Sequence, residues 1–238
     1  MNTVELFAGT ESFSKVASRL GYNTLTVDNN KDLNPDLCID IMDLIPHNFM
    51  GNCFDNGMDS VDILWCSPPC TAFSVASIGH HWNKDHTPKT SHAIEGLQIL
   101  TRNILIIKEL LEINPDMIWF IENPRGKMRK VIDEIFKMYK ITNYKRNTVT
   151  YCQYGDTRMK PTDIWTNLIE WQPRPICKNG ASCHVSAPRG SRTGTQGLKN
   201  AKDRGVIPSA LFEHIFKVIE QKSAPCLEQE SNQESVRK

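Results

Sequence analysis

The sequence predicts one α/β domain with a mainly parallel sheet flanked by helices. Short apolar segments typical of strands alternate with amphipathic helical segments along the first 150 residues. Several predicted strands end in Gly, Pro or acidic residues, and open α/β sheets bind ligands at such strand ends. The 238 residues suffice for one sizeable core, and an apolar content of 39% with a charged content of 23% is ordinary for a globular protein.

The first unit follows the order strand, glycine turn, helix, strand, acid. Residues 3–7 form the predicted strand and 8–12 the turn, followed by a helix over 14–20, a strand over 22–27 and then Asp28. The glycine lets a ligand approach the backbone, and the acid can accept hydrogen bonds from a ribose. Because the turn has one glycine instead of a G-x-G-x-x-G set, the pattern favours a nucleoside without phosphates, such as S-adenosylmethionine (AdoMet).

A third short strand over 37–44 places Asp40 where it can accept from an adenine amino group, although an ordinary loop acid is the alternative. Residues 46–60 are expected to be a loop. The apolar run 61–65 predicts a buried strand that stops at two prolines, which cannot donate to a sheet. Cys70 therefore lies on a loop at a strand end and is a candidate nucleophile; a structural buried cysteine is the alternative.

The polar segment 75–91 is expected to be a loop that closes over the site. It contains several histidines, but their spacing matches no compact zinc pattern. The periodic segment 91–114 predicts a helix, and the strand over 117–121 delivers Glu122 to the same sheet edge as Cys70. A buried carboxyl there has a raised pKa and can donate a proton.

A basic helix over 127–139, a strand over 147–151 and a hairpin over 154–167 with a cationic tip are expected next. A stretch rich in Pro, Gly, Ser, Lys and Arg then leads to a last helix over 209–221. Four residues of this part could form a small zinc site, but because their spacing is irregular, free cysteines are favoured and no metal is predicted. These zinc candidates are Cys152, Cys177, Cys183 and His184.

The net charge of +1 conceals a segregation along the chain. Residues 1–122 hold 7 Lys and Arg against 16 Asp and Glu, whereas residues 123–205 hold 17 against 6. A basic block of this size favours a polyanion partner such as nucleic acid. No apolar run approaches membrane-spanning length and no signal pattern opens the chain, so a cytoplasmic protein without a membrane partner is expected.

Several of these segments resemble, in order, the motifs of the DNA (cytosine-5) methyltransferases. The match spans about residues 3–220, and the compact length looks most like versions carried by bacteriophages, which implies a bacterial or phage-infected cell. The similar motifs are the AdoMet loop at Phe7–Gly9, the acid Asp28, the Asp-Ile pair at 40–41, the nucleophile loop Asp62–Ser74, the Glu-Asn pair at 122–123, the cation-bearing strand from Tyr154 and, loosely, the closing segment Gly205–Pro208.

The resemblance implies a class-I AdoMet-dependent methyltransferase fold, Rossmann-like, and a set of site residues. The implied catalytic residues are Cys70, Glu122, Arg158 and Lys160. The implied cofactor-binding residues are Phe7, Ala8, Gly9, Thr10, Asp28, Asn29, Asp40, Ile41 and Pro68. The implied substrate-binding residues are Ser74, Asn123 and Arg125.

The implied reaction is methyl transfer from AdoMet to carbon 5 of a cytosine flipped out of double-stranded DNA. Cys70 would add to carbon 6, Glu122 would hold ring nitrogen 3, and Arg158 or Lys160 would bind the base oxygen. The chain departs from the family at Thr10–Ser12, where glycines are usual, and at Thr71, where glutamine is usual. The usual Gln-x-Arg-x-Arg signature is also reduced, which leaves open which cation contacts the base.

The expected organisation is a catalytic core over 1–150, a reduced target-recognition segment over 151–205, a closing helix over 206–222 and a disordered tail over 223–238. A monomer is expected. Two alternatives stay open: the same chemistry on an RNA such as tRNA, and a non-catalytic nucleic-acid-binding protein on a methyltransferase scaffold.

Overall fold

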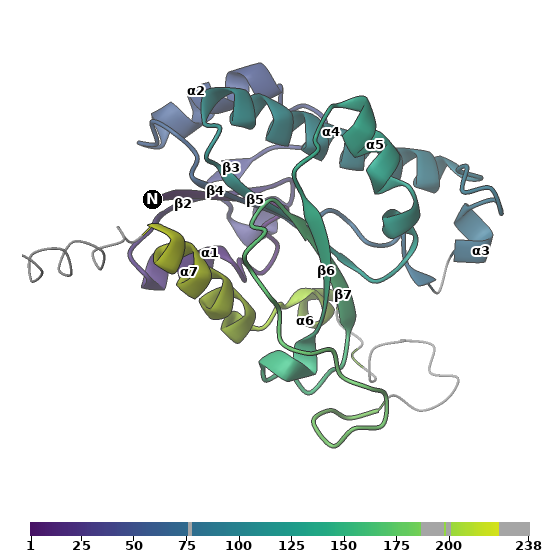
Figure 1. Ribbon diagram of the computed structural model, residues 1–238. Helices are drawn as coiled ribbons and strands as arrows, with labels where there is room; N and C mark the ends of the chain where they lie inside the picture. The colour runs from purple at the N-terminus through teal and green to yellow at the C-terminus, as the bar shows by residue number, and fades with distance from the viewer. Residues whose placement is uncertain (76–77, 187–197, 199–200, 224–238) are drawn as a thin grey trace, which may run out of the picture.

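The computed structural model describes residues 1–75, 78–186, 198 and 201–223 (Figure 1). The predicted tail beyond Ser223 and most of the basic stretch 187–200 lie outside the described residues. No helix in the described part of the chain is both long enough and apolar enough to cross a membrane.

The core is a seven-stranded sheet with the order β3-β2-β1-β4-β5-β7-β6. All pairs from β3 to β5 are parallel, and β7 runs antiparallel between β5 and β6. The mainly parallel sheet is therefore confirmed. The strands are β1 (Asn2–Leu6), β2 (Asn23–Asp28), β3 (Leu37–Cys38), β4 (Ile63–Cys66), β5 (Ile118–Pro124), β6 (Lys145–Thr150) and β7 (Pro161–Thr166).

Helices cover both faces of this sheet, as predicted (Figure 1). One face is covered by α1 (Ser14–Arg19) and α7 (Ser209–Ser223), and the other by α2 (Pro46–Asp55), α4 (Ser91–Ile113) and α5 (Ile132–Met138). Because the central strands are buried on both faces, they are nearly continuous apolar runs; every residue of β4 is buried.

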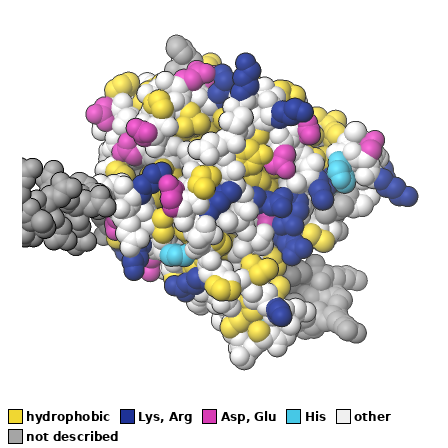
Figure 2. All heavy atoms as spheres, viewed as in Figure 1, with side chains coloured by type: hydrophobic (Ala, Val, Ile, Leu, Met, Phe, Trp, Pro, Cys, Tyr) yellow, Lys and Arg dark blue, Asp and Glu magenta, His cyan; other side chains and the backbone are white. Residues whose placement is uncertain are grey.

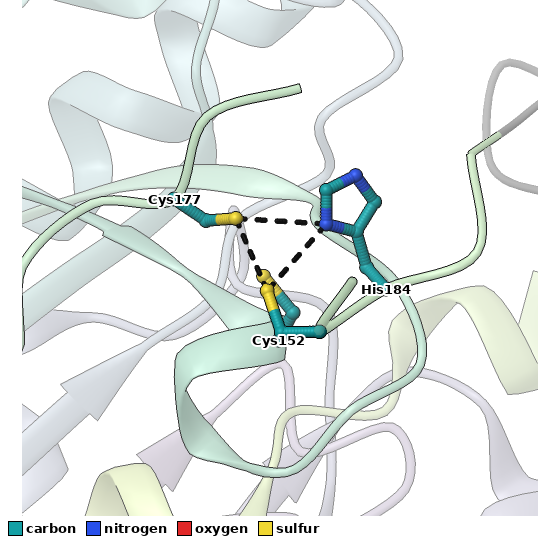
Figure 3. Close-up of side chains that lie close together, drawn as sticks. Cys152, Cys177 and His184 are labelled. Atoms are coloured by element: carbon teal, nitrogen blue, oxygen red, sulfur yellow. Dashed lines mark hydrogen bonds between the residues drawn. The ribbon is translucent and has the colours of Figure 1, made fainter. Parts of the chain in front are cut away.

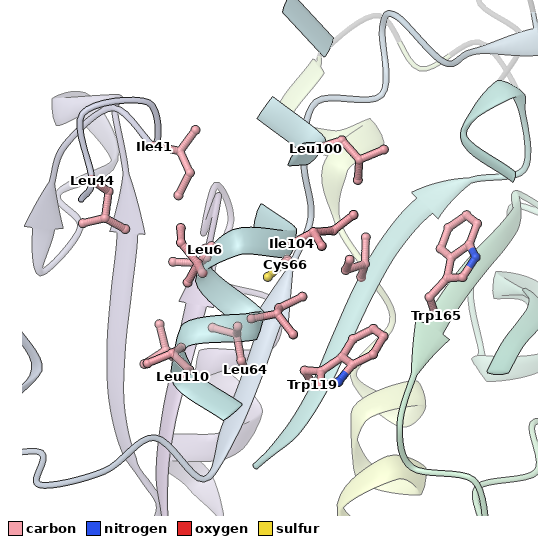
Figure 4. Close-up of a cluster of buried hydrophobic side chains, with 14 of the residues drawn as sticks. Leu6, Ile41, Leu44, Leu64, Cys66, Leu100, Ile104, Leu110, Trp119 and Trp165 are labelled. Atoms are coloured by element: carbon pink, nitrogen blue, oxygen red, sulfur yellow. The ribbon is translucent and has the colours of Figure 1, made fainter. Parts of the chain in front are cut away.

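Each face has its own apolar core. On the α4 side, Leu64, Ile104 and Trp119 belong to a cluster of buried side chains between the sheet and the helices (Figure 4). On the α7 side, the rings of Trp65 and Phe212 meet edge to face with centroids 4.8 Å apart. These two cores hold the strand ends that carry the site in fixed positions.

Four local predictions were wrong. The strand expected over 37–44 ends at Cys38, and residues 41–43 form a turn. Residues 46–55 form α2 instead of a loop, because proline is favoured at the start of a helix and the buried Phe49, Met50 and Cys53 share one helix face. Segment 75–91 contains a short helix, α3 (Ile78–His81), followed by the buried Trp82. The basic segment 127–139 is split into a 3-10 turn and α5, instead of one helix.

The predicted target-recognition segment 151–205 contributes β7 to the main sheet. The hairpin expected there is formed by β6 and β7, which are joined by a 3-10 turn, η4 (Tyr151–Tyr154), and a loop. The division of the chain into functional segments stays a prediction.

Candidate active site

Cys70 lies on the loop that follows β4, at the carboxyl end of the sheet. The next strand along the chain, β5, pairs with β4 in parallel and delivers Glu122 and Asn123 to the same edge. The buried Asn123 side-chain amide donates a hydrogen bond of 3.0 Å to the carbonyl oxygen of Pro68. The loop of the predicted nucleophile is therefore attached to the loop of the predicted acid, as the strand order requires.

Two further contacts hold the far end of the nucleophile loop. The indole N–H of Trp82 donates to the carbonyl of Ala72 at 2.7 Å, and the backbone N–H of Lys127 donates to the carbonyl of Phe73 at 2.8 Å. The Phe73 and Trp82 rings stack with centroids 5.7 Å apart. A loop fixed at both ends keeps its cysteine in one place, which a nucleophile needs.

Glu122 is 5% exposed, and its carboxylate accepts a hydrogen bond of 3.1 Å from the hydroxyl of Tyr151. Burial raises the pKa of Glu122, while the positive charge of Lys160 and hydrogen bonds from Tyr151 and Ser67 oppose that rise. The carboxyl is thus biased toward its protonated form, as predicted for a proton donor.

Burial also raises the pKa of the Cys70 thiol, and the negative charge of Glu122 raises it further. The positive charge of Lys160 acts in the opposite direction and favours the thiolate. The three side chains therefore share one electrostatic environment: Cys70 loses its proton most easily when Glu122 is neutral and Lys160 is present.

The two predicted cations have different surroundings. Arg158 is 5% exposed, and its guanidinium pairs with Asp156 through two of its nitrogens. It also donates to the carbonyls of Asp203, Arg204 and Val206, at 3.0, 3.2 and 2.9 Å. The five N–H groups of a guanidinium thereby all find acceptors within the protein.

Lys160 lies closer to the predicted chemistry. Its ammonium sits 4.8 Å from the centre of the Tyr151 ring, and the Tyr151 hydroxyl donates to Glu122. The ammonium also donates to the carbonyl of Arg204 at 3.0 Å. Its backbone has a φ of 25°, which is uncommon in a residue other than glycine and is often found at functional positions.

The residues predicted to bind the cofactor lie at the ends of β1, β2, β3 and β4, which are neighbours in the sheet. The Gly9 N–H donates to one carboxylate oxygen of Asp28 at 3.0 Å, and the Asn29 amide donates to Asp40 at 3.2 Å. Gly9 has a φ of 50°, which glycine adopts without strain. Phe7, Ala8 and Thr10 complete the turn, whereas the side chains of Ile41 and Pro68 are buried.

This edge fits a nucleoside such as AdoMet. The carboxylates of Asp28 and Asp40 are hydrogen-bond acceptors, which suit ribose hydroxyls and an exocyclic amino group. The closing segment also reaches this turn, since the backbone N–H of Ile207 donates to the Ser12 hydroxyl at 3.2 Å. Chain segments far apart in sequence thus meet at the proposed cofactor edge.

The three predicted substrate-binding residues are not equivalent. Asn123 is fully buried and holds the Pro68 carbonyl, so its position suits a residue that orients the loop. Ser74 is half-buried on the nucleophile loop, and Arg125 is exposed on the loop after Glu122.

Two buried polar residues, Tyr151 and Glu5, have contacts that no sequence pattern predicted. Tyr151 was expected only as a strand end, yet it is fully buried and donates to Glu122. Glu5 lies in β1, and its carboxylate accepts from the backbone N–H groups of Phe13 and Ser14 at 3.2 and 2.9 Å. Burial raises the pKa of Glu5 to about 7. An acidic residue within an otherwise apolar predicted strand could have indicated that Glu5 is buried and hydrogen-bonded.

Gly126 brings the two site loops into close contact. A methyl group built on its α-carbon would lie 2.2 Å from the carbonyl oxygen of Phe73, far inside van der Waals contact. We expect Gly126→Ala to push the nucleophile loop away from the Glu122 loop and to lower the free energy of unfolding by about 1–3 kcal/mol. Urea unfolding measures this loss, and methyl-transfer assays measure the loss of activity.

Gly51→Ala is the matched control, because Gly51 lies in α2 and a methyl group there meets nothing within 4 Å. This control should keep or slightly raise the stability, since alanine favours helix. Equal stability of the Gly126→Ala and Gly51→Ala proteins would show that the Gly126–Phe73 contact does not constrain the loops.

The structure also brings together the residues considered as zinc candidates. The ligand atoms of Cys152, Cys177, Cys183 and His184 all lie within 4.8 Å of one another. Among the described residues, the histidines between 80 and 92 form no such cluster.

The surface charge follows the segregation along the chain. Figure 2 shows Lys and Arg side chains gathered over β6 and β7, whereas Asp and Glu side chains are more frequent at the upper left of the view. Exposed basic residues of this half include Arg125, Lys130, Lys137, Arg146, Arg174 and Lys178. Such a face is suited to a phosphate backbone.

One protein sequence matches most of the chain. The "Probable DNA (cytosine-5)-methyltransferase" of Frog virus 3 (isolate Goorha) is 30% identical over 196 residues, which cover 77% of this chain and 78% of the viral protein. A scan against models of known protein families finds no match.

A solved structure shares the fold. A protein described as a DNA modification methyltransferase, from an E. coli prophage, superposes with a TM-score of 0.50 at 18% identity over 70% of this chain and 46% of its own. The S. pombe Dnmt2 methyltransferase gives 0.47 at 16% identity over 73% and 52%. The chain spans about half the length of these structures. The mainly parallel sheet together with the superposition on the prophage protein confirms the class-I, Rossmann-like fold.

Proposed function

Because the chain belongs to the DNA (cytosine-5) methyltransferase family, we propose that it transfers a methyl group from AdoMet to carbon 5 of cytosine in DNA. One observation carries the proposal: the Cys70 loop and the Glu122 loop are joined by the Asn123–Pro68 hydrogen bond at the carboxyl ends of adjacent strands. The Cys70 thiol and a carboxyl whose pKa is raised by burial then lie at the same edge of the sheet.

In the proposed reaction the Cys70 thiolate forms a bond to carbon 6 of cytosine, which makes carbon 5 electron-rich. Glu122 donates its proton toward ring nitrogen 3, so that negative charge does not build up on the ring. Bound AdoMet supplies an electrophilic methyl group. Methyl transfer leaves S-adenosylhomocysteine. Loss of the carbon-5 proton to solvent, breakage of the bond between sulfur and carbon 6, and return of the nitrogen-3 proton to the Glu122 carboxylate then restore the neutral ring and free the Cys70 thiolate.

Lys160 has the position proposed for the cation that contacts the base oxygen and favours the thiolate. Arg158 is proposed instead to hold the segment 203–206 beside the site, because the protein already uses all its donors. A cytosine in a duplex is inaccessible to Cys70, so the base must be flipped out, and the basic face would hold the phosphates.

The test is incorporation of labelled methyl groups from AdoMet into unmethylated duplex DNA, with tRNA and fully 5-methylcytosine-substituted duplex in parallel. We expect labelled 5-methyldeoxycytidine in the first duplex only, identified by mass spectrometry of the digested nucleosides. Label in tRNA alone would support the RNA alternative. A folded protein that binds DNA but neither binds AdoMet nor transfers methyl groups would be the non-catalytic scaffold.

A pair of variants separates the two cations. We expect Lys160→Met to leave the denaturation midpoint nearly unchanged and to lower kcat/KM by at least about tenfold, because the thiolate loses its nearby positive charge. Arg158→Lys should instead lower the free energy of unfolding by about 1.5–3 kcal/mol, since an ammonium cannot reproduce the fork of charged hydrogen bonds. Urea unfolding and steady-state kinetics on both proteins check this. An Arg158→Lys protein of unchanged stability but without activity would reverse the assignment.

A further inference from the structure

Three cysteines and one histidine converge beside the β6–β7 hairpin. Cys152 lies in η4, and the other three residues lie at least 25 positions further along the chain. The Cys177 sulfur is 3.2 Å from the Cys183 sulfur and 3.5 Å from Nδ1 of His184, and Cys183 is 3.7 Å from the same nitrogen. Figure 3 shows Cys177 and His184 directed toward each other with Cys152 beside them.

We propose that Cys152, Cys177, Cys183 and His184 bind one Zn²⁺ ion. Zinc takes thiolate and imidazole ligands in a tetrahedron, with bonds of about 2.3 Å to sulfur and 2.0–2.1 Å to nitrogen. Two ligand atoms of such a tetrahedron lie about 3.5–3.8 Å apart, close to the separations seen among Cys177, Cys183 and His184. Four protein ligands leave no open position, so the site is structural and not catalytic.

The surrounding backbone holds the ligands in position. The Cys177 N–H donates to the hydroxyl of Thr150 at 2.9 Å, and the Val185 N–H donates to the carbonyl of Thr157 at 2.9 Å. The side-chain amide of Gln153 donates to the Cys183 sulfur at 3.5 Å, a contact that strengthens when the sulfur is a thiolate. Hydrogen bonds that orient the ligand residues in this way are typical of a metal site.

The segment that carries three of the ligands has little else to hold it. Among the described residues from 172 to 186 no apolar side chain is fully buried, and Ile176 and Val185 are 58% and 63% exposed. A segment without a core cannot offset the entropy cost of its order by apolar burial, and a metal cross-link supplies the missing stabilisation. Zinc binding displaces the thiol protons of the three cysteines and couples the fold of this segment to the metal.

The site also adjoins the proposed chemistry. Cys152 directly follows Tyr151, whose hydroxyl donates to Glu122. Metal binding is independent of the proposed function; only an effect of the metal on activity depends on it. The metal content and the ligand set can therefore be tested without any turnover measurement.

The experiment uses the full chain, purified without a histidine tag from a zinc-supplemented culture. We expect about one zinc per chain by elemental mass spectrometry. Replacement of zinc by Co²⁺ should give the d–d bands of a tetrahedral site and the charge-transfer band of thiolate ligands. Cys177→Ser and Cys152→Ser should each lose most of the metal. Cys38→Ser is the matched control, because Cys38 is an exposed cysteine on β3, and it should keep the metal.

Two results would overturn the proposal. One is a wild-type protein that contains no zinc and gives no tetrahedral cobalt spectrum under reducing conditions. The other is a disulfide between Cys177 and Cys183, identified by peptide mass spectrometry in protein prepared with zinc under reducing conditions. Both measurements use the wild-type protein, so an unfolded variant does not affect them.

Discussion

Replacement of Cys70 by serine should lower methyl transfer by on the order of a thousandfold or more, while binding of DNA and AdoMet stays intact. The hydroxyl of serine does not ionise near neutral pH, and burial together with Glu122 opposes any anion at this position, as the raised pKa of Cys70 shows. The variant is nearly isosteric and the loop is anchored by backbone contacts, so the fold should be unchanged.

A duplex that carries 5-fluorocytosine gives a second readout. Fluorine replaces the proton that must leave carbon 5, so the bond between the enzyme sulfur and carbon 6 should persist after methyl transfer. We expect a covalent complex on denaturing gels with wild-type and Cys38→Ser protein, and none with Cys70→Ser. Wild-type activity in the Cys70→Ser protein would exclude the covalent mechanism.

The sequence was sufficient to place Cys70 and Glu122 at one edge because parallel strands carry their carboxyl ends to the same side. The strands β4 and β5 are neighbours, and the Asn123–Pro68 hydrogen bond follows directly from this order. The same reasoning placed Asp28 and Asp40 at adjacent strand ends. Local patterns and strand order are therefore enough when the contact is between consecutive elements of the sheet.

The choice between Arg158 and Lys160 depends on contacts that no local pattern encodes. Besides the neighbouring Asp156, the acceptors that surround Arg158 come from residues 203–206, more than forty positions away. The cysteine–histidine cluster has the same origin, because its ligand atoms come together only when residues 177–184 fold back onto η4. Sequence spacing predicts compact metal motifs, and it fails when a long loop separates the ligands.

The helix α2 was not predicted, for a different reason. Its buried residues Phe49, Met50 and Cys53 are few and are interrupted by polar and small residues. A ten-residue helix of this composition is stabilised mainly by packing on its neighbour, since short helices are marginal on their own. Tertiary packing thus stabilises α2, although its local sequence favours helix only weakly.

The second large effect is expected for Glu122→Gln, which should lower kcat about a hundredfold. The amide of glutamine can still donate a hydrogen bond to ring nitrogen 3, but it cannot transfer a proton to it. Removal of the carboxylate also removes a negative charge that raises the pKa of Cys70. The variant should therefore form its thiolate at lower pH than the wild-type protein does, and still react more slowly.

The pH dependence separates these two effects. The reactive form needs a protonated Glu122 and an ionised Cys70. A carboxyl ordinarily ionises at lower pH than a thiol, and burial raises the pKa of both groups here. The wild-type kcat/KM should rise with pH up to the pKa of Glu122. It should then stay flat, because each gain in thiolate is offset by an equal loss of protonated acid, and fall above the pKa of Cys70.

In Glu122→Gln the flat region should disappear, and kcat/KM should rise continuously until Cys70 is ionised. Measurement of both proteins from about pH 5 to 10 with the same duplex checks this, because the usual pKa values of a glutamate carboxyl and a cysteine thiol are about 4.3 and 8.5 and both are raised here. The Gly51→Ala protein, altered only in α2, should reproduce the wild-type profile. Parallel wild-type and Glu122→Gln profiles would mean that Glu122 does not titrate during the reaction, and its place in the mechanism would then be limited to orienting the base.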